Sequence, residues 1–148
     1  ASSDLSLYRE RNDQFHKVMN IEFKAHNPAQ EQIRKDIEKL IRESIAGTWF
    51  HVLKNVDSRT IPVLFEKMKE SLLQCERFLG NTGLSCIFCF CVFEKPWACM
   101  KDFHYNSKKE NFQEYLNSFF ALDYSVQNKK IEINNEHNWN ILKKTVFK

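Results

Sequence analysis

The stretch from Leu84 to Phe93 constrains the fold most, because it is apolar almost throughout. Alternate side chains of a β-strand point to opposite faces. One face of such a strand would carry Leu84, Cys86, Phe88, Phe90 and Val92, and the other Ser85, Ile87, Cys89, Cys91 and Phe93. Since both faces are apolar, we predict a strand that is covered on both sides, by helices or by a partner chain.

Two amphipathic helices are predicted before this strand. Apolar residues follow helical spacing over residues 30–46, and Gly47 is expected to end that helix. A second apolar stripe runs from Val63 to Leu79 and is expected to end at Gly80. Residues 4–24 are predicted to form a further helix, although Ile21 to Phe23 also suits a short extended piece.

The remaining segments favour strands. Residues 49–53 suit a strand or a packed connection, and residues 97–105 are expected to pair antiparallel with the apolar strand. A short helix over 111–120 and a hairpin of 122–126 with 130–133 follow, whereas 139–148 give no clear pattern. We therefore predict an α+β fold, with two or more amphipathic helices packed on a mainly antiparallel sheet. Residues 1–148 form a single domain in this prediction, with 1–26 as an N-terminal extension or helix and 27–148 as the α+β core.

Composition narrows the class of protein. The 22 basic residues are interleaved with 19 acidic ones, so the net charge is only +3, and a dedicated nucleic-acid domain is usually more basic. No apolar run reaches 18 residues, so we expect no membrane helix, and residues 1–6 lack the features of a signal peptide. Five cysteines, an odd number, favour free thiols in a reducing, cytoplasmic setting.

The candidate chemical motifs are weak. Cys86 and Cys89 have the spacing of a zinc or redox pair, but residues three apart on a strand face opposite sides, so we expect core packing instead. The sequence contains no glycine-rich phosphate loop, nucleophile elbow or His-Glu-x-x-His motif. We therefore predict a non-catalytic protein with no cofactor and no metal. An enzyme whose Cys and His meet only in the folded chain stays an alternative.

Three lysine doublets lie in the aromatic-rich C-terminal half, at 108–109, 129–130 and 143–144. Basic residues beside aromatic ones can bind single-stranded nucleic acid by base stacking. A small nucleic-acid-binding or viral accessory protein with a basic, aromatic face is therefore the alternative function.

The order of elements over residues 30–95 is distinctive. A charged helix from Gln30 to Ala46 leads to Trp49-Phe50, and Val56-Asp57-Ser58-Arg59-Thr60 then opens a second helix. A Gly-Asn turn and an apolar, Cys-containing strand ending in Phe93-Glu94-Lys95 follow. This order resembles that of the Tctex-type dynein light chains. The chain departs from that family's pattern after this strand, where a Trp-Asp and glycine-rich turn is missing, and residues 111–120 would be an insertion.

This resemblance implies a homo- or heterodimer in the cytoplasm, at the cytoskeleton or in cilia, that binds an extended peptide of a motor intermediate chain by strand addition. A protein-protein interaction module is accordingly the first functional hypothesis. The predicted partner or dimer interface consists of Ser85, Ile87, Cys89, Cys91, Phe93 and Trp97.

Overall fold

The computed structural model describes residues 4–80, 84–94, 97–127, 130–134 and 136–143. The strands in this part of the chain are β1 (Leu5–Arg11), β2 (Gln14–Ala25), β3 (Ala46–Leu53), β4 (Leu84–Val92), β5 (Trp97–Tyr105), β6 (Asp123–Gln127), β7 (Lys130–Asn134) and β8 (Asn140–Lys143). The helices are α1 (Gln30–Arg42), α2 (Thr60–Cys75) and α3 (Phe112–Phe119), and a 3₁₀ turn at Glu76–Phe78 follows α2.

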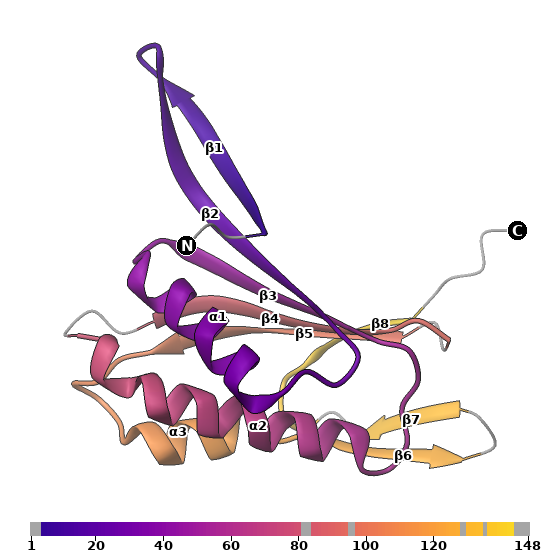
Figure 1. Ribbon diagram of the computed structural model, residues 1–148. Helices are drawn as coiled ribbons and strands as arrows, with labels where there is room; N and C mark the ends of the chain where they lie inside the picture. Colours follow the sequence, from indigo (N-terminus) through magenta and orange to yellow (C-terminus); the bar gives the residue numbers. More distant parts are fainter. Residues whose placement is uncertain (1–3, 81–83, 95–96, 128–129, 135, 144–148) are drawn as a thin grey trace, which may run out of the picture.

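Six strands form one mixed sheet in the order β1-β2-β3-β4-β5-β8, while β6 and β7 pair separately. The β2–β3 and β3–β4 ladders are parallel, and the other three are antiparallel. Both parallel connections are crossovers that step the same way across the sheet. Because such crossovers are right-handed, α1 and α2 lie on the same face, where α3 joins them (Figure 1). The predicted α+β class with a mainly antiparallel sheet is confirmed.

The core lies between the helices and this face of the sheet. The Phe65 ring of α2 lies 5.1 Å from that of Phe90 and 5.4 Å from that of Trp139, measured between centroids. The Phe119 ring of α3 lies 4.9 Å from that of Phe103 on β5. These aromatic contacts bury large apolar areas and join α2, α3 and the segment before β8 to the sheet.

Several predicted elements are confirmed. The apolar strand is β4, and its neighbour β5 pairs with it antiparallel from Val92–Trp97 to Leu84–Tyr105. The short helix predicted over 111–120 is α3, and the predicted hairpin is β6–β7. The tail that gave no clear pattern contains β8, whereas residues 144–148 lie outside the described residues.

The first predicted amphipathic helix has the expected buried face but a different end. α1 ends at Arg42, and Ser44 takes a left-handed conformation, with φ 51°, just beyond it. Gly47, expected to end the helix, lies inside β3 instead. A Cβ atom at this position would come within 3.2 Å of Leu40 Cδ2, so glycine allows α1 to approach the sheet closely.

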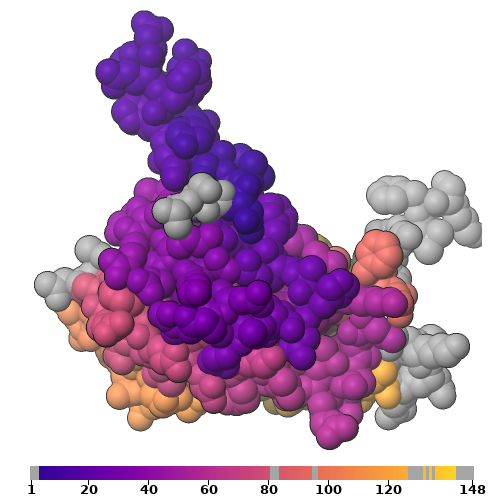
Figure 2. All heavy atoms as spheres, viewed as in Figure 1, coloured from indigo at the N-terminus to yellow at the C-terminus, as the bar shows by residue number. Residues whose placement is uncertain are grey.

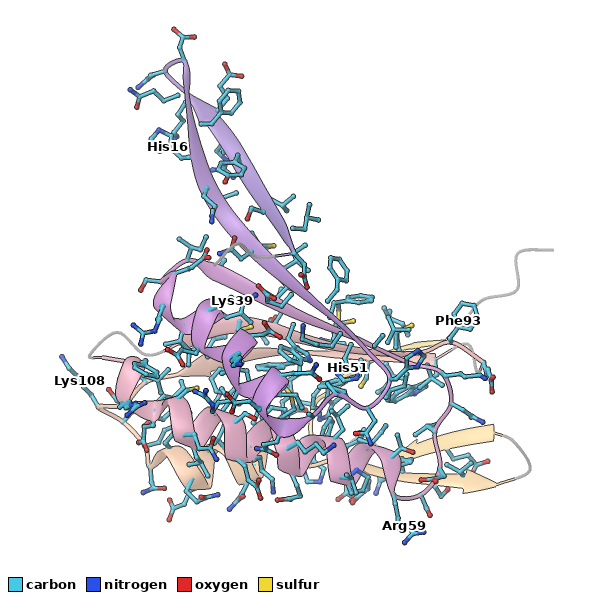
Figure 3. All side chains as sticks on the ribbon, viewed as in Figure 1. His16, Lys39, His51, Arg59, Phe93 and Lys108 are labelled. Carbon is cyan, nitrogen blue, oxygen red and sulfur yellow. The ribbon has the colours of Figure 1, made fainter. Side chains whose placement is uncertain are left out.

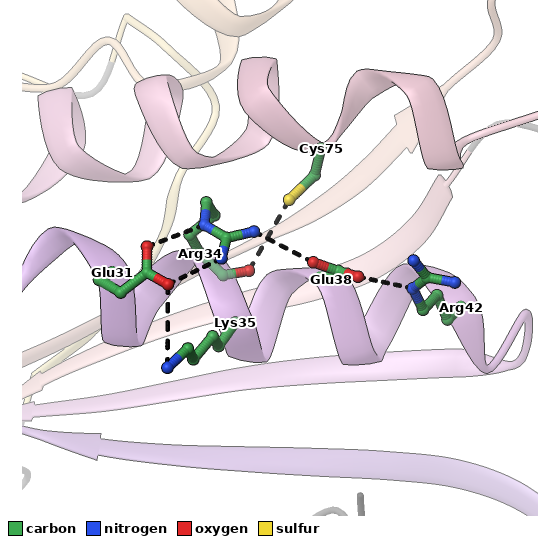
Figure 4. Close-up of polar contacts among 6 residues, drawn as sticks. All are labelled: Glu31, Arg34, Lys35, Glu38, Arg42 and Cys75. Atoms are coloured by element: carbon green, nitrogen blue, oxygen red, sulfur yellow. Dashed lines mark hydrogen bonds and ion pairs between the residues drawn. The ribbon is translucent and has the colours of Figure 1, made fainter.

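The outer side of α1 carries a row of ion pairs (Figure 4). The Arg34 guanidinium lies 2.7 Å from Glu31 and 3.1 Å from Glu38, and Arg42 lies 2.7 Å from Glu38. Ion pairs that are partly exposed to solvent stabilise a helix only slightly. The opposite side of α1 is packed in the core, and the Cys75 thiol of α2 donates to the carbonyl oxygen of Arg34 at 3.7 Å.

The predicted helix over residues 4–24 is wrong, because this segment forms the β1–β2 hairpin. Asn12 and Asp13 have φ values of 51° and 57°, as a two-residue type I′ turn requires. Nor is the segment an extension outside the core, since Met19 to Ala25 pair with β3. Its distal part, residues 8–18, projects beyond the rest of the molecule (Figures 1 and 2). We call these residues the arm.

Replacing Phe88 by alanine tests the assignment of the core. Phe88 is 1% exposed and packs against the rings of Phe119 and Phe120. We expect Phe88→Ala to lower the free energy of unfolding by roughly 3–5 kcal/mol, because it leaves a cavity. Phe93, just past the same strand, is 80% exposed, so Phe93→Ala should cost less than about 0.5 kcal/mol. Equal losses in urea-unfolding experiments would contradict this assignment.

Candidate functional site

The sheet face opposite the helices is the candidate site, and we call it the open face. The strand register arranges most of its side chains in three rows: Leu5, Ile21, Thr48, Ile87 and Asp102; then Phe23, Phe50, Cys89, Met100 and Asn140; then Ala25, Val52, Cys91, Ala98 and Leu142. Beside the first row, Leu7, Met19, Ala46, Ser85 and His104 lie on the same face. No described helix or strand lies over these rows (Figure 1). The open face is therefore a continuous, mostly apolar surface.

Exposure varies across the open face. Leu5, Phe23 and Leu142 are 44%, 45% and 56% exposed, whereas Cys89 in the centre is only 5% exposed because its neighbours shield it. Single exposed apolar residues are common on proteins, but a patch that spans six strands is not. Such patches mark sites where a protein binds another molecule.

The orientation of β2 is unusual for a strand with solvent on one side. Its polar Asn20 and Glu22 face α1 and are 1% and 0% exposed. Its apolar Ile21 and Phe23 point to the open face. A sheet with one solvated face normally places apolar residues inside and polar residues outside. β2 does the opposite, with its polar side against α1 and its apolar side on the open face.

A set of hydrogen bonds and ion pairs, the polar ladder, connects β2 to α1. Its members are Lys17, Asn20, Glu22 and Lys24 of β2, Asp36 and Lys39 of α1, and Glu43 directly after α1. Lys39, labelled in Figure 3, lies 3.0 Å from both Glu22 and Asp36. The polar ladder therefore fixes which side of β2 faces the helix.

A β-bulge continues the polar ladder to the base of the arm. Leu7 pairs with Met19, but the next residue, Tyr8, pairs with Lys17, so Val18 is the extra residue. The bulge reverses the alternation of side chains beyond this point. Lys17 thereby reaches Glu43 at the end of α1, with 3.1 Å between Nζ and the carboxylate.

Burial dominates the electrostatics of the polar ladder. It raises the pKa of the Glu22 carboxyl above its usual value, against the opposing effect of Lys39. Burial alone would lower the pKa of Lys39, but hydrogen bonds to Glu22 and Asp36 outweigh it and raise this pKa. Lys39 is therefore the cation that allows a carboxylate to be buried at this position.

Of the six predicted interface residues, the structure brings five to one side of the sheet. Ser85, Ile87, Cys89 and Cys91 project from β4 onto the open face. Phe93 follows the end of β4 and is exposed, as Figure 3 shows. Trp97 differs, because it faces the helices and is 5% exposed. Trp97 pairs with Val92 across the antiparallel ladder, so both side chains lie on the buried face of the sheet.

The predicted interface did not include the β2 and β3 part of the open face. Ile21, Phe23, Phe50 and Val52 complete the rows on either side of β4. The signal for β2 was the alternation of Met19, Ile21 and Phe23 with polar residues, which the prediction of a helix obscured. The same alternation places Phe50 and Val52 together on one side of β3.

The cysteines have the properties of packing residues. Burial raises the pKa of Cys86 to about 12 and that of Cys89 to about 11, and it also raises the pKa values of Cys75 and Cys99. These four thiols are therefore protonated at neutral pH and are poor nucleophiles. Cys86 faces the helices while Cys89 faces the open side, as strand alternation predicted.

The other candidate groups do not assemble into a chemical site. His51 is fully buried and its Nε2 lies 2.8 Å from the His26 carbonyl oxygen, which it contacts as a donor, while burial lowers its pKa. Among the described residues, no three His, Cys, Asp or Glu side chains form a group that could hold a metal ion. Of the three lysine doublets, Lys108–Lys109 is exposed, whereas Lys129 and Lys144 lie outside the described residues.

Comparisons with known proteins give no match. No protein-family model matches the chain, and no curated protein or solved structure does so. Within the described residues, none of the helices has the length and apolar character needed to span a bilayer.

Replacing Lys39 by methionine tests the polar ladder. The change leaves Glu22 as a buried, unpaired carboxylate, so we expect the free energy of unfolding at neutral pH to fall by roughly 3–5 kcal/mol. The Glu22 carboxyl has a raised pKa, so it holds its proton more tightly in the folded chain than in the unfolded chain. Its contribution to the free energy of unfolding therefore falls as pH rises from the pKa of the unfolded chain to that of the folded chain. The loss should accordingly shrink at mildly acidic pH in urea-unfolding experiments.

Two variants control for the lost side chain itself. The double variant Lys39→Met/Glu22→Gln leaves no unpaired charge at the ladder's centre and should recover most of the stability. Lys35→Met removes a lysine of the same helix whose side chain is 68% exposed, and it should change little. A double variant as unstable as the single one would show that packing, rather than charge, explains the loss.

Proposed function

We propose that this chain is a non-catalytic protein-binding module and that the open face is its binding surface. The observation that carries the proposal is the orientation of β2. The strand buries Glu22 against α1 and presents Ile21 and Phe23 outward. Burying a carboxylate is costly and leaving aromatic surface in water is unfavourable, so a partner that covers the outer side would make this arrangement more favourable.

The composition of the open face supports a protein as the bound molecule. Most side chains in its rows are aliphatic, aromatic or sulfur-containing; the exceptions are the uncharged Thr48 and Asn140 and one carboxylate, Asp102, at the β5 margin. Apolar centres with few charges are typical of stable protein interfaces. Nucleic-acid binding is less well supported, because Tyr105 and Phe112, the aromatic residues next to Lys108–Lys109, are 6% and 2% exposed and cannot stack on bases.

The resemblance to Tctex-type dynein light chains names one partner of this class, a peptide of a motor intermediate chain. That partner stays a prediction, and the proposal does not depend on it. A synthetic intermediate-chain peptide that binds with saturation would support it. The expected mode would be strand addition at β1 or β8, the outermost strands of the described sheet.

A pair of matched variants tests the proposed function. Phe23 on the open face is 45% exposed, and Val63 on α2 is 48% exposed. We expect Phe23→Glu to abolish binding of protein partners, because it places an unpaired charge in the interface, whereas Val63→Glu should preserve it. The difference can be measured by expressing each tagged chain in the cells that naturally contain the protein. The proteins that co-purify with it are then quantified by mass spectrometry.

Both variants must first give the circular dichroism spectrum of the folded wild-type chain. A differently tagged second copy expressed in the same cells shows whether self-association contributes to the recovered material. If Phe23→Glu recovers the same proteins in the same amounts as wild type, the open face is not the binding surface.

A further inference from the structure

We propose that the molecule covering the open face is a second copy of this chain, packed face to face. This inference rests on the proposed function and specifies its partner. Two sheets stacked in this way pack about 10 Å apart, with their strands within about 30° of each other. The result would be a sandwich with the helices of each copy on the outside.

The charge of the open face favours an identical partner. In a two-fold interface the same surface meets itself, so a charged centre would repel its own copy. The three rows contain no Lys, Arg or Glu, and Asp102 lies at the margin. A strongly charged partner surface would find almost no charged groups to pair with in these rows. An apolar surface of the same extent, such as the open face of a second copy, would bury the rows without leaving unpaired charges.

The side chains of β3 and β4 on the open face differ in size. Phe50 of β3 is large and packs against Phe23 of β2, with 5.6 Å between the ring centroids. Its neighbour on β4, Cys89, is small, as is Cys91 beside Val52. A two-fold axis parallel to the strands and between β3 and β4 would place β3 of one copy over β4 of the other, so that Phe50 would lie over Cys89 and Val52 over Cys91.

The same axis also matches the margins of the sheet. It would bring β1 of one copy over β8 of the other, because these strands lie at equal distances from it. Leu5 and Leu142, exposed leucines of these two strands, would then lie on the same margin of the interface, two rows apart along the strands.

The area of the open face reaches the lower limit for a specific dimer. Each row crosses five strands about 4.8 Å apart, and the three rows lie about 7 Å apart, so the side chains of the rows cover roughly 24 by 20 Å, or about 500 Å² in projection. Two copies would bury about twice that area, near the roughly 1,000 Å² that separates specific interfaces from accidental contacts. The relief of the side chains adds to the projected area.

Light scattering on the purified chain measures its mass in solution and so distinguishes a monomer from a dimer. We expect twice 17.7 kDa for wild type and for Val63→Glu at both low and high salt, because the interface is apolar. Phe23→Glu should remain folded and raise the dissociation constant by roughly 100-fold or more, giving 17.7 kDa. A wild-type mass of 17.7 kDa at micromolar concentration would overturn the inference.

A natural thiol distinguishes face-to-face packing from pairing along a sheet edge. Cys91 is half-buried in the single chain and lies on the open face. In the wild-type dimer, alkylation of Cys91 by iodoacetamide should be at least about tenfold slower than in the monomeric Phe23→Glu variant, measured by peptide mass spectrometry. Equal rates would show a dimer formed elsewhere and would overturn the face-to-face arrangement.

The two proposals can fail separately. The wild-type chain could be monomeric while Phe23→Glu still abolishes binding of a different protein. That result would contradict the dimer and support the proposed function. A monomeric chain whose partners are unaffected by this substitution contradicts both.

Discussion

The burial of Glu22 against α1 decides how the β2 edge of the sheet is arranged. A carboxylate that is 0% exposed needs a cation close by, and Lys39 supplies it at 3.0 Å. A register slip of one residue would exchange the two sides of β2 and bring Ile21 or Phe23 against the charges of α1. Because β1 pairs with β2 within the described residues, the position of β1 and of the arm depends on the same contact.

The open face lacks helices because of the order in which the strands are connected, and not only because of which residues it contains. The two parallel crossovers place α1 and α2 on one side, and the aromatic residues of α3 add to that side through Phe88 and Phe103. With its helices used there, the described chain has no element left for the opposite face. The apolar residues are therefore divided between one surface that the chain covers itself and one that it leaves available.

The sequence was sufficient to predict the elements whose pattern is local. β4 was predicted from its continuous apolar run and β5 as its antiparallel partner, whereas α3 was predicted from helical spacing and the β6–β7 hairpin from alternation. The β1–β2 hairpin was not, because Leu7, Phe15 and Met19 also match helical spacing, and Asn12-Asp13 contains no glycine to mark the turn. For the open face, alternation along β4 located Ile87 and Cys91 correctly, but it could not show that Trp97 faces the helices. Which side of β5 is buried depends on its register with β4, and sequence spacing alone does not determine that register.

The two parts of the sheet differ in how much they depend on a partner. β4 and β5 hold the aromatic core on their helix side, so their packing does not require the open face to be covered. β1 and β2 lack such a core, because the side of β2 toward α1 is polar and the residues of the arm are largely exposed. Contacts on the open face would therefore stabilise the β1–β2 edge most, where an exposed apolar edge strand would otherwise favour unspecific association. Binding of a partner would thus be coupled to the ordering of this edge, and the conformational freedom of the arm would fall on association.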